Sequence, residues 1–131
     1  MRSLLAALLA AGTVFILNRY MLQKARPAFT VAISPFIEEG AKTLLAILLA
    51  GPMSIVAVHA IFGAVEGFFD LVTGSRTGIG AGIISAAGHL LFGAITLEVI
   101  AGGGNILGGI GAASLAHLTW NLLVLKFLVR S

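Results

Sequence analysis

The chain has 131 residues, of which 59% are hydrophobic and 10% are charged, and its mean hydropathy is +1.09. A soluble domain carries roughly a quarter charged residues on its surface, so this composition excludes a soluble globular protein and requires lipid as solvent. The net charge of +3, with the basic residues near the ends of apolar runs, argues against nucleic acid as a partner. The absence of cysteine excludes disulfides and thiol chemistry.

Turn and charge signals divide the sequence into five apolar stretches, each long enough to cross a hydrocarbon core about 30 Å thick. The first begins like a signal peptide at Leu4–Leu9 but runs on to a basic cluster, so we interpret it as a retained helix. Glycine-containing turns at Gly51-Pro52, 74–78 and Gly102–Gly104 separate the later stretches. The expected spans are residues 3–20, 27–50, 52–73, 79–100 and 105–129. The sequence therefore predicts an all-α polytopic membrane protein, a compact bundle of about five transmembrane helices forming one domain over residues 1–131.

Basic residues predict the orientation of the bundle. They follow the first, third and fifth spans: Arg19, Lys24, Arg26, Arg76, Lys126 and Arg130. In a five-span chain these three places share one side of the membrane. Because basic residues favour the cytoplasmic side, we expect a multi-pass protein of the cell membrane with its N-terminus outside and its C-terminus in the cytoplasm.

Several polar residues lie inside the expected spans, where a charged group costs roughly 2.5–3.5 kcal/mol and therefore suggests a function. They are Glu38, Glu39, Lys42, His59, Glu66, Asp70, His89, Glu98, His117 and Asn121. At about 1.5 Å per residue from the cytoplasmic end, Glu38, His89 and His117 each lie near ~16 Å. Glu66 lies near ~10 Å by the same measure. Four groups on four helices thus share a depth near the middle of the bilayer, which predicts one common site.

Four short motifs, one per helix and in chain order, give a resemblance to a known family. They are Glu38-Glu39-Gly40-Ala41-Lys42 (EExxK), Phe62-Gly63-Ala64-Val65-Glu66 (FxxxE), His89 followed by Phe92, and His117-Leu118-Thr119-Trp120-Asn121 (HxxxN). Over residues 30–125 the set resembles the PrsW family, within the CAAX-protease and bacteriocin-processing superfamily of intramembrane peptidases. The resemblance implies cleavage of membrane-associated proteins, in some members anti-sigma factors. The second motif departs from the CAAX-type pattern, which has His where this chain has Glu66.

The EExxK motif supplies the candidate for water activation. Peptide hydrolysis needs an activated water, and Glu38 is placed to act as its general base. Glu39 follows about 100° further round the helix, so we expect it to orient Glu38 or a neighbouring group. Lys42 lies one turn from Glu38 and is expected to balance its charge or to pair with Glu39.

Two versions of the chemistry stay open at this point. In one, Glu66, His89 and His117 bind Zn²⁺, because two His and one carboxylate with an open fourth position form a common catalytic zinc set. In the other, Glu38 and a histidine activate water directly, and His117 with Asn121 forms the oxyanion hole. No organic cofactor is expected in either version.

The expected partners are the lipid bilayer and a membrane-associated protein or peptide substrate, and so short a chain is compatible with a homo-oligomer. Two other functions fit the same residues. Buried Glu and His chains also serve as proton relays, so a small proton or ion carrier is one alternative. A non-catalytic factor that binds membrane peptides is the other.

Overall fold

The structure, a computed structural model, describes residues 1–73 and 78–128, without the side chains of residues 27, 28, 70, 78, 79, 81 and 124–128. Five long α-helices follow one another in the chain. They are α1 (Arg2–Lys24), α2 (Pro27–Ala50), α3 (Ile55–Val72), α4 (Gly78–Ala101) and α5 (Ile106–Leu128), with a short 3₁₀ turn, η1 (Pro52–Ser54), before α3. No strand occurs within these described ranges. The helices begin and end within a few residues of the expected spans.

The prediction of a helical membrane protein is confirmed. Four segments are long and apolar enough to cross a membrane: Arg2–Lys24, Pro52–Phe69, Gly82–Ala101 and Ile106–Leu123. The helix α2 has the same length as α4 but is more polar, because Glu38, Glu39 and Lys42 lie in its middle. The chain is thus a polytopic membrane protein in which one helix carries most of the buried charge.

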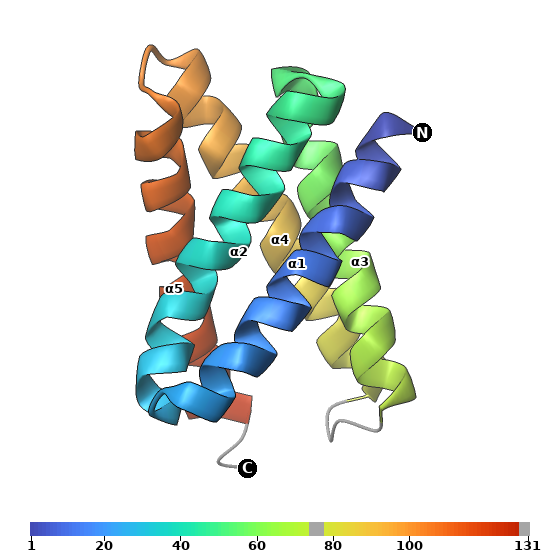
Figure 1. The fold of residues 1–131 in the computed structure, drawn as a ribbon, viewed down its shortest axis with the longest axis vertical. Helices are drawn as coiled ribbons and strands as arrows, with labels where there is room; N and C mark the ends of the chain where they lie inside the picture. The colour runs from blue at the N-terminus through green and yellow to red at the C-terminus, as the bar shows by residue number, and fades with distance from the viewer. Residues whose placement is uncertain (74–77, 129–131) are drawn as a thin grey trace.

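The helices form a bundle in which α1 packs on α2 and α3, while α4 packs between α3 and α5 (Figure 1). The helix α2 closes the bundle by contacting α5. The last turns of α1, α3 and α5 lie at one end, opposite the N-terminus, as the alternating direction of five spans requires (Figure 1). Arg19, Lys24 and Arg26 therefore lie at the end where α3 and α5 finish. Arg76 and Arg130, and the side chain of Lys126, lie outside the described residues.

Two glycines make the tight connections at the other end of the bundle. Gly51 and Gly103 have φ angles of 89° and 90°, a backbone conformation that side chains with a Cβ rarely adopt. Gly51 ends α2 ahead of the 3₁₀ turn, so the expected third span begins with η1 before α3 starts at Ile55. These two glycines allow very short loops, and the short loops keep consecutive helices in contact.

Small residues bring α3 and α4 unusually close together. A Cβ placed on Gly67 would lie 2.9 Å from the Cα of Gly82, and one on Gly63 would lie 2.9 Å from the Cα of Ala86. Such close approach between backbones is typical of helix packing in membranes. Lipid provides no hydrophobic driving force between helices, so they associate through close packing at small residues. The two helices therefore hold a fixed register against each other.

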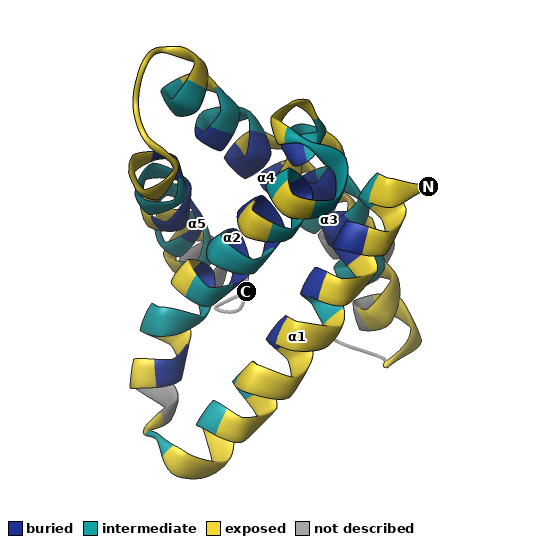
Figure 2. Ribbon diagram, turned by 45° about the horizontal axis from the view of Figure 1, so that its top comes forward, coloured by how far each residue is buried: buried dark blue, intermediate teal, exposed yellow. Residues whose placement is uncertain are grey.

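Helix α1 is buried mainly along its first half, and in its second half Asn18 donates a hydrogen bond to Ser34 of α2. Its buried residues are Ala6, Ala7, Ala10 and Val14, and most of the helix beyond Val14 is exposed in Figure 2. The large side chains on this outer surface, such as Ile16 and Leu22, face the lipid that the composition requires. The bundle thus has a tightly packed pair, α3 and α4, and a more loosely covered side at α1.

The close α3–α4 contact can be tested with the Gly67→Ala variant. We expect it to lower the free energy of unfolding by about 1–3 kcal/mol, because the new Cβ would collide with the backbone of Gly82. Gly12→Ala is the matched control, since nothing lies within 4 Å of a Cβ at Gly12. Thermal unfolding in detergent, followed by circular dichroism, measures both. Equal stability of Gly67→Ala and the wild type would contradict the packing described above.

Candidate active site

The carboxylate of Glu39 is the centre of a buried polar network. Its side chain is 0% exposed, and it contacts three groups from three helices. Lys42 Nζ lies 2.5 Å from Oε1, His117 Nδ1 lies 2.9 Å from Oε1, and His59 Nε2 lies 2.9 Å from Oε2. A buried carboxylate is stable only when charges and hydrogen bonds replace its water, and these three groups do so. Glu39 therefore ties α2 to α3 and α5.

This arrangement fixes the ring of His117. Because a carboxylate oxygen accepts hydrogen bonds, Nδ1 of His117 is the donor to Glu39, and Nε2 keeps its lone pair when the ring is neutral. The ring also stacks on Phe92, with a centroid separation of 4.6 Å and an angle of 16° between the planes. Hydrogen bonding and stacking together hold Nε2 toward Glu38.

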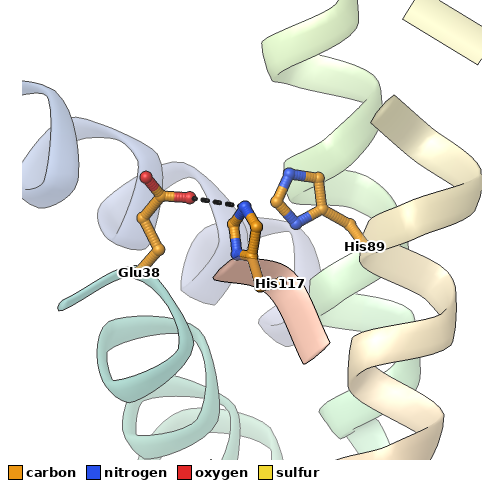
Figure 3. A group of neighbouring side chains, drawn as sticks. All are labelled: Glu38, His89 and His117. Carbon is orange, nitrogen blue, oxygen red and sulfur yellow. Dashed lines mark ion pairs between the residues drawn. The ribbon is translucent and has the colours of Figure 1, made fainter. Parts of the chain in front are cut away.

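Glu38 points to the same place from α2 (Figure 3). Its Oε1 accepts hydrogen bonds from Ser34 Oγ at 2.7 Å and from Asn18 Nδ2 at 3.4 Å. Its Oε2 is buried and has no hydrogen-bond partner among the described residues, and it lies 3.8 Å from Nε2 of His117. A separation of this size is too long for a direct hydrogen bond but suits one water molecule bonded to both atoms.

His89 lies beside this pair, but both of its ring nitrogens are engaged. Nδ1 is 2.8 Å from Lys42 Nζ, so it accepts a hydrogen bond from the ammonium group. Nε2 then donates to Glu66 Oε2 at 2.5 Å, and Ser85 Oγ donates to the same oxygen at 2.9 Å. The side chain of Glu66 is 42% exposed, so this branch leads from the buried network toward the surface.

One group of three metal-donor residues occurs among the described residues, and its third member differs from the prediction. The sequence predicts Glu66 with the two histidines, whereas the structure groups Glu38, His89 and His117, with donor atoms within 4.8 Å of one another. Glu66 instead binds the far nitrogen of His89. The prediction used only the depth of each residue in the membrane, which is similar for all four groups. Which carboxylate faces which histidine depends on the rotation of each helix about its own axis.

The donors of this group do not fit Zn²⁺ as they are arranged. A zinc ligand must offer a free lone pair at about 2.0–2.1 Å, and only Glu38 Oε2 and His117 Nε2 have one. The lone pair on Nδ1 of His89 already accepts from Lys42, and a lysine ammonium 2.8 Å away would repel a cation there. Zinc binding would require Lys42 to leave Nδ1 of His89.

The remaining predicted residues have clear positions. Glu39 has an orienting contact, to His117 and not to Glu38. Lys42 pairs with Glu39, one of the two expected arrangements, and also lies 4.7 Å from the ring centroid of Phe62. Asn121 is half-buried one turn beyond His117 and makes no hydrogen bond to another described residue.

Four polar residues in contact with the site were not assigned to it by sequence analysis. They are Asn18, Ser34, His59 and Ser85. Ser34 precedes Glu38 by one helical turn, a spacing that places both on one face of α2. His59 precedes Glu66 by about two turns but belongs to none of the four motifs. Asn18 and Ser85 are small polar residues in apolar runs and gave no motif.

The comparisons with known proteins add no assignment. No family model matches the chain, and no curated protein or solved structure matches it. The resemblance to the PrsW family therefore stays a prediction that depends on the four motifs.

Both ring nitrogens of His89 are hydrogen-bonded, which predicts a low zinc content. We expect detergent-purified protein to contain much less than one equivalent of zinc, and added zinc to bind weakly, because His89 has no free lone pair. Metal analysis after dialysis against zinc measures this, with His117→Ala and His89→Ala alongside. Stoichiometric zinc in the wild type, lost in both variants, would contradict the hydrogen-bond assignment of His89.

Proposed function

We propose that this protein is an intramembrane peptidase that hydrolyses peptide bonds of membrane-associated substrates, with Glu38 as the general base and no metal. The observation that carries the proposal is Oε2 of Glu38, which has no hydrogen-bond partner in the part of the chain that the structure describes and faces Nε2 of His117 at 3.8 Å. A buried carboxylate oxygen without a donor costs free energy, and such groups occur where a function requires them.

The chemistry follows from this pair of acceptors. A water bonded to Glu38 Oε2 and His117 Nε2 gives up one proton to Glu38, and its oxygen forms the bond to the scissile carbonyl carbon. When the C–N bond breaks, the proton passes to the leaving nitrogen, so the products are a carboxylic acid and an amine. Glu39 holds His117 in the required tautomer, as a carboxylate does for histidine in other hydrolytic sites. Asn121, one turn further along α5, is the candidate donor to the oxyanion.

The resemblance and the position of the site support the same function. Glu38, His89 and His117 lie near the midpoints of α2, α4 and α5, so the reaction would take place in the middle of the bilayer. The first half of α1 covers the bundle tightly, whereas Asn18, which contacts Glu38, lies on the loosely covered half. A substrate that is itself a membrane segment suits such a site.

We further propose that the protein lies in the cell membrane with its N-terminus outside and its C-terminus in the cytoplasm. Arg19, Lys24 and Arg26 lie at the end of the bundle where α1, α3 and α5 finish (Figure 1). Basic residues at one end favour the cytoplasmic side.

The Glu38→Gln variant tests the peptidase directly. It keeps an oxygen for the hydrogen bond from Ser34 but cannot accept a proton from water, so we expect cleavage to slow about 10²–10⁴-fold with little loss of stability. Purified protein is reconstituted in liposomes with single-span peptides, and mass spectrometry detects the products. Glu98→Gln, which removes an exposed carboxylate, is the matched control. Undiminished cleavage by Glu38→Gln would remove Glu38 from the mechanism.

A proton carrier is the second candidate, because hydrogen bonds connect exposed Glu66 through His89 and Lys42 to buried Glu39. Such a chain is what a proton relay requires. We expect liposomes containing the wild-type protein to show no more proton flux than empty liposomes under a pH gradient, measured with an internal pH dye. Flux that disappears in Glu66→Gln, without cleavage of any peptide, would favour the carrier over the peptidase.

A further inference from the structure

His59 lies outside all four motifs, yet the structure places it in the centre of the network. Its side chain is 0% exposed, and Gly93 of α4 packs directly against it, so that a Cβ on Gly93 would lie 2.8 Å from His59 Cβ. The close packing of α3 on α4 leaves little space around the base of this side chain. Its two ring nitrogens contact a backbone carbonyl oxygen and a carboxylate oxygen.

Those two partners are both acceptors. Nδ1 lies 2.8 Å from the backbone carbonyl oxygen of Ile55, which has no hydrogen to give. Nδ1 must therefore be the donor. In a neutral imidazole the other nitrogen would then present a lone pair, and Nε2 lies 2.9 Å from the carboxylate oxygen Oε2 of Glu39. Two lone pairs at that distance repel, so a proton must lie between Nε2 and Oε2.

The environment of Glu39 indicates which atom holds this proton. Its other oxygen, Oε1, already accepts from Lys42 Nζ and from His117 Nδ1. An ammonium group and a second donor on one oxygen stabilise the ionised carboxylate, and an ionised Glu39 requires Nε2 of His59 to be the donor. The proton therefore belongs to His59.

We propose that His59 is a positioning residue: it carries protons on both ring nitrogens and, by donating to Oε2, fixes the Glu39 carboxylate that orients His117. The catalytic consequence rests on the proposed peptidase function, whereas the protonation state does not. His89 carries one proton, on Nε2, because its Nδ1 accepts from Lys42. His117 carries a proton on Nδ1, and the proposed mechanism requires its Nε2 to be bare. The three histidines of the chain thus have three different protonation patterns.

Nitrogen NMR of detergent-solubilised protein with ¹⁵N-labelled histidine tests the protonation state without any assay of activity. We expect one ring, lost in His59→Gln and so assigned to His59, to carry a proton on each nitrogen at neutral pH. The other two rings should each show one protonated and one bare nitrogen. A bare nitrogen in the His59 ring would overturn the proposal, because it would place the proton on Glu39 or break the contact.

The positioning role is tested by comparing His59→Gln with His59→Leu. Gln keeps a donor for Glu39 and should leave the Nδ1-protonated pattern of His117 in place. Leu removes the donor, so we expect His117 to show a mixture of both tautomers, and kcat for peptide cleavage to fall about 10–100-fold with KM within about 2-fold. An unchanged His117 pattern in a folded His59→Leu protein would overturn the role. If no peptide is cleaved even by the wild type, the peptidase proposal fails while the NMR result still decides the role of His59.

Discussion

The bundle depends on the burial of one carboxylate far from water. Neither lipid nor a neighbouring helix backbone, whose hydrogen bonds are already made, can solvate Glu39, so the donors must be side chains. Lys42, His59 and His117 supply them from α2, α3 and α5. Each donor is in turn restrained, His59 by a backbone carbonyl and His117 by the stacked ring of Phe92. The contacts that join these helices are therefore the same contacts that build the site.

The glycines of α3 and α4 make that structure sterically possible. A Cβ on Gly63 would meet the side chain of His89 at 2.9 Å, and one on Gly93 would meet His59 at 2.8 Å. The histidines thus occupy the space that glycine leaves on the opposite helix. Packing in the membrane interior and placement of the polar groups therefore depend on the same few small residues.

The sequence was sufficient to predict the five helices and the depth of Glu38, His89 and His117, because both depend only on apolar length and on the rise per residue. It did not predict which carboxylate would face His117, since that depends on the rotation of each helix about its axis. His59 was missed because it belongs to none of the four motifs, and only the rotation of α3 turns it toward Glu39. The tautomer of each histidine depends on which atoms its ring nitrogens contact, and residue spacing does not give those contacts.

The polarity of α2 has a consequence for how the protein is made. A lone helix with Glu38, Glu39 and Lys42 at its centre would enter lipid at a cost of several kcal/mol. The four more apolar segments are long and apolar enough to cross a membrane without such a cost at their centres. The Lys42–Glu39 pair offsets part of that cost within α2, but the remaining donors arrive only with α3 and α5, later in the chain. Insertion of α2 during synthesis is therefore completed by helices that have not yet left the ribosome when it first meets the membrane.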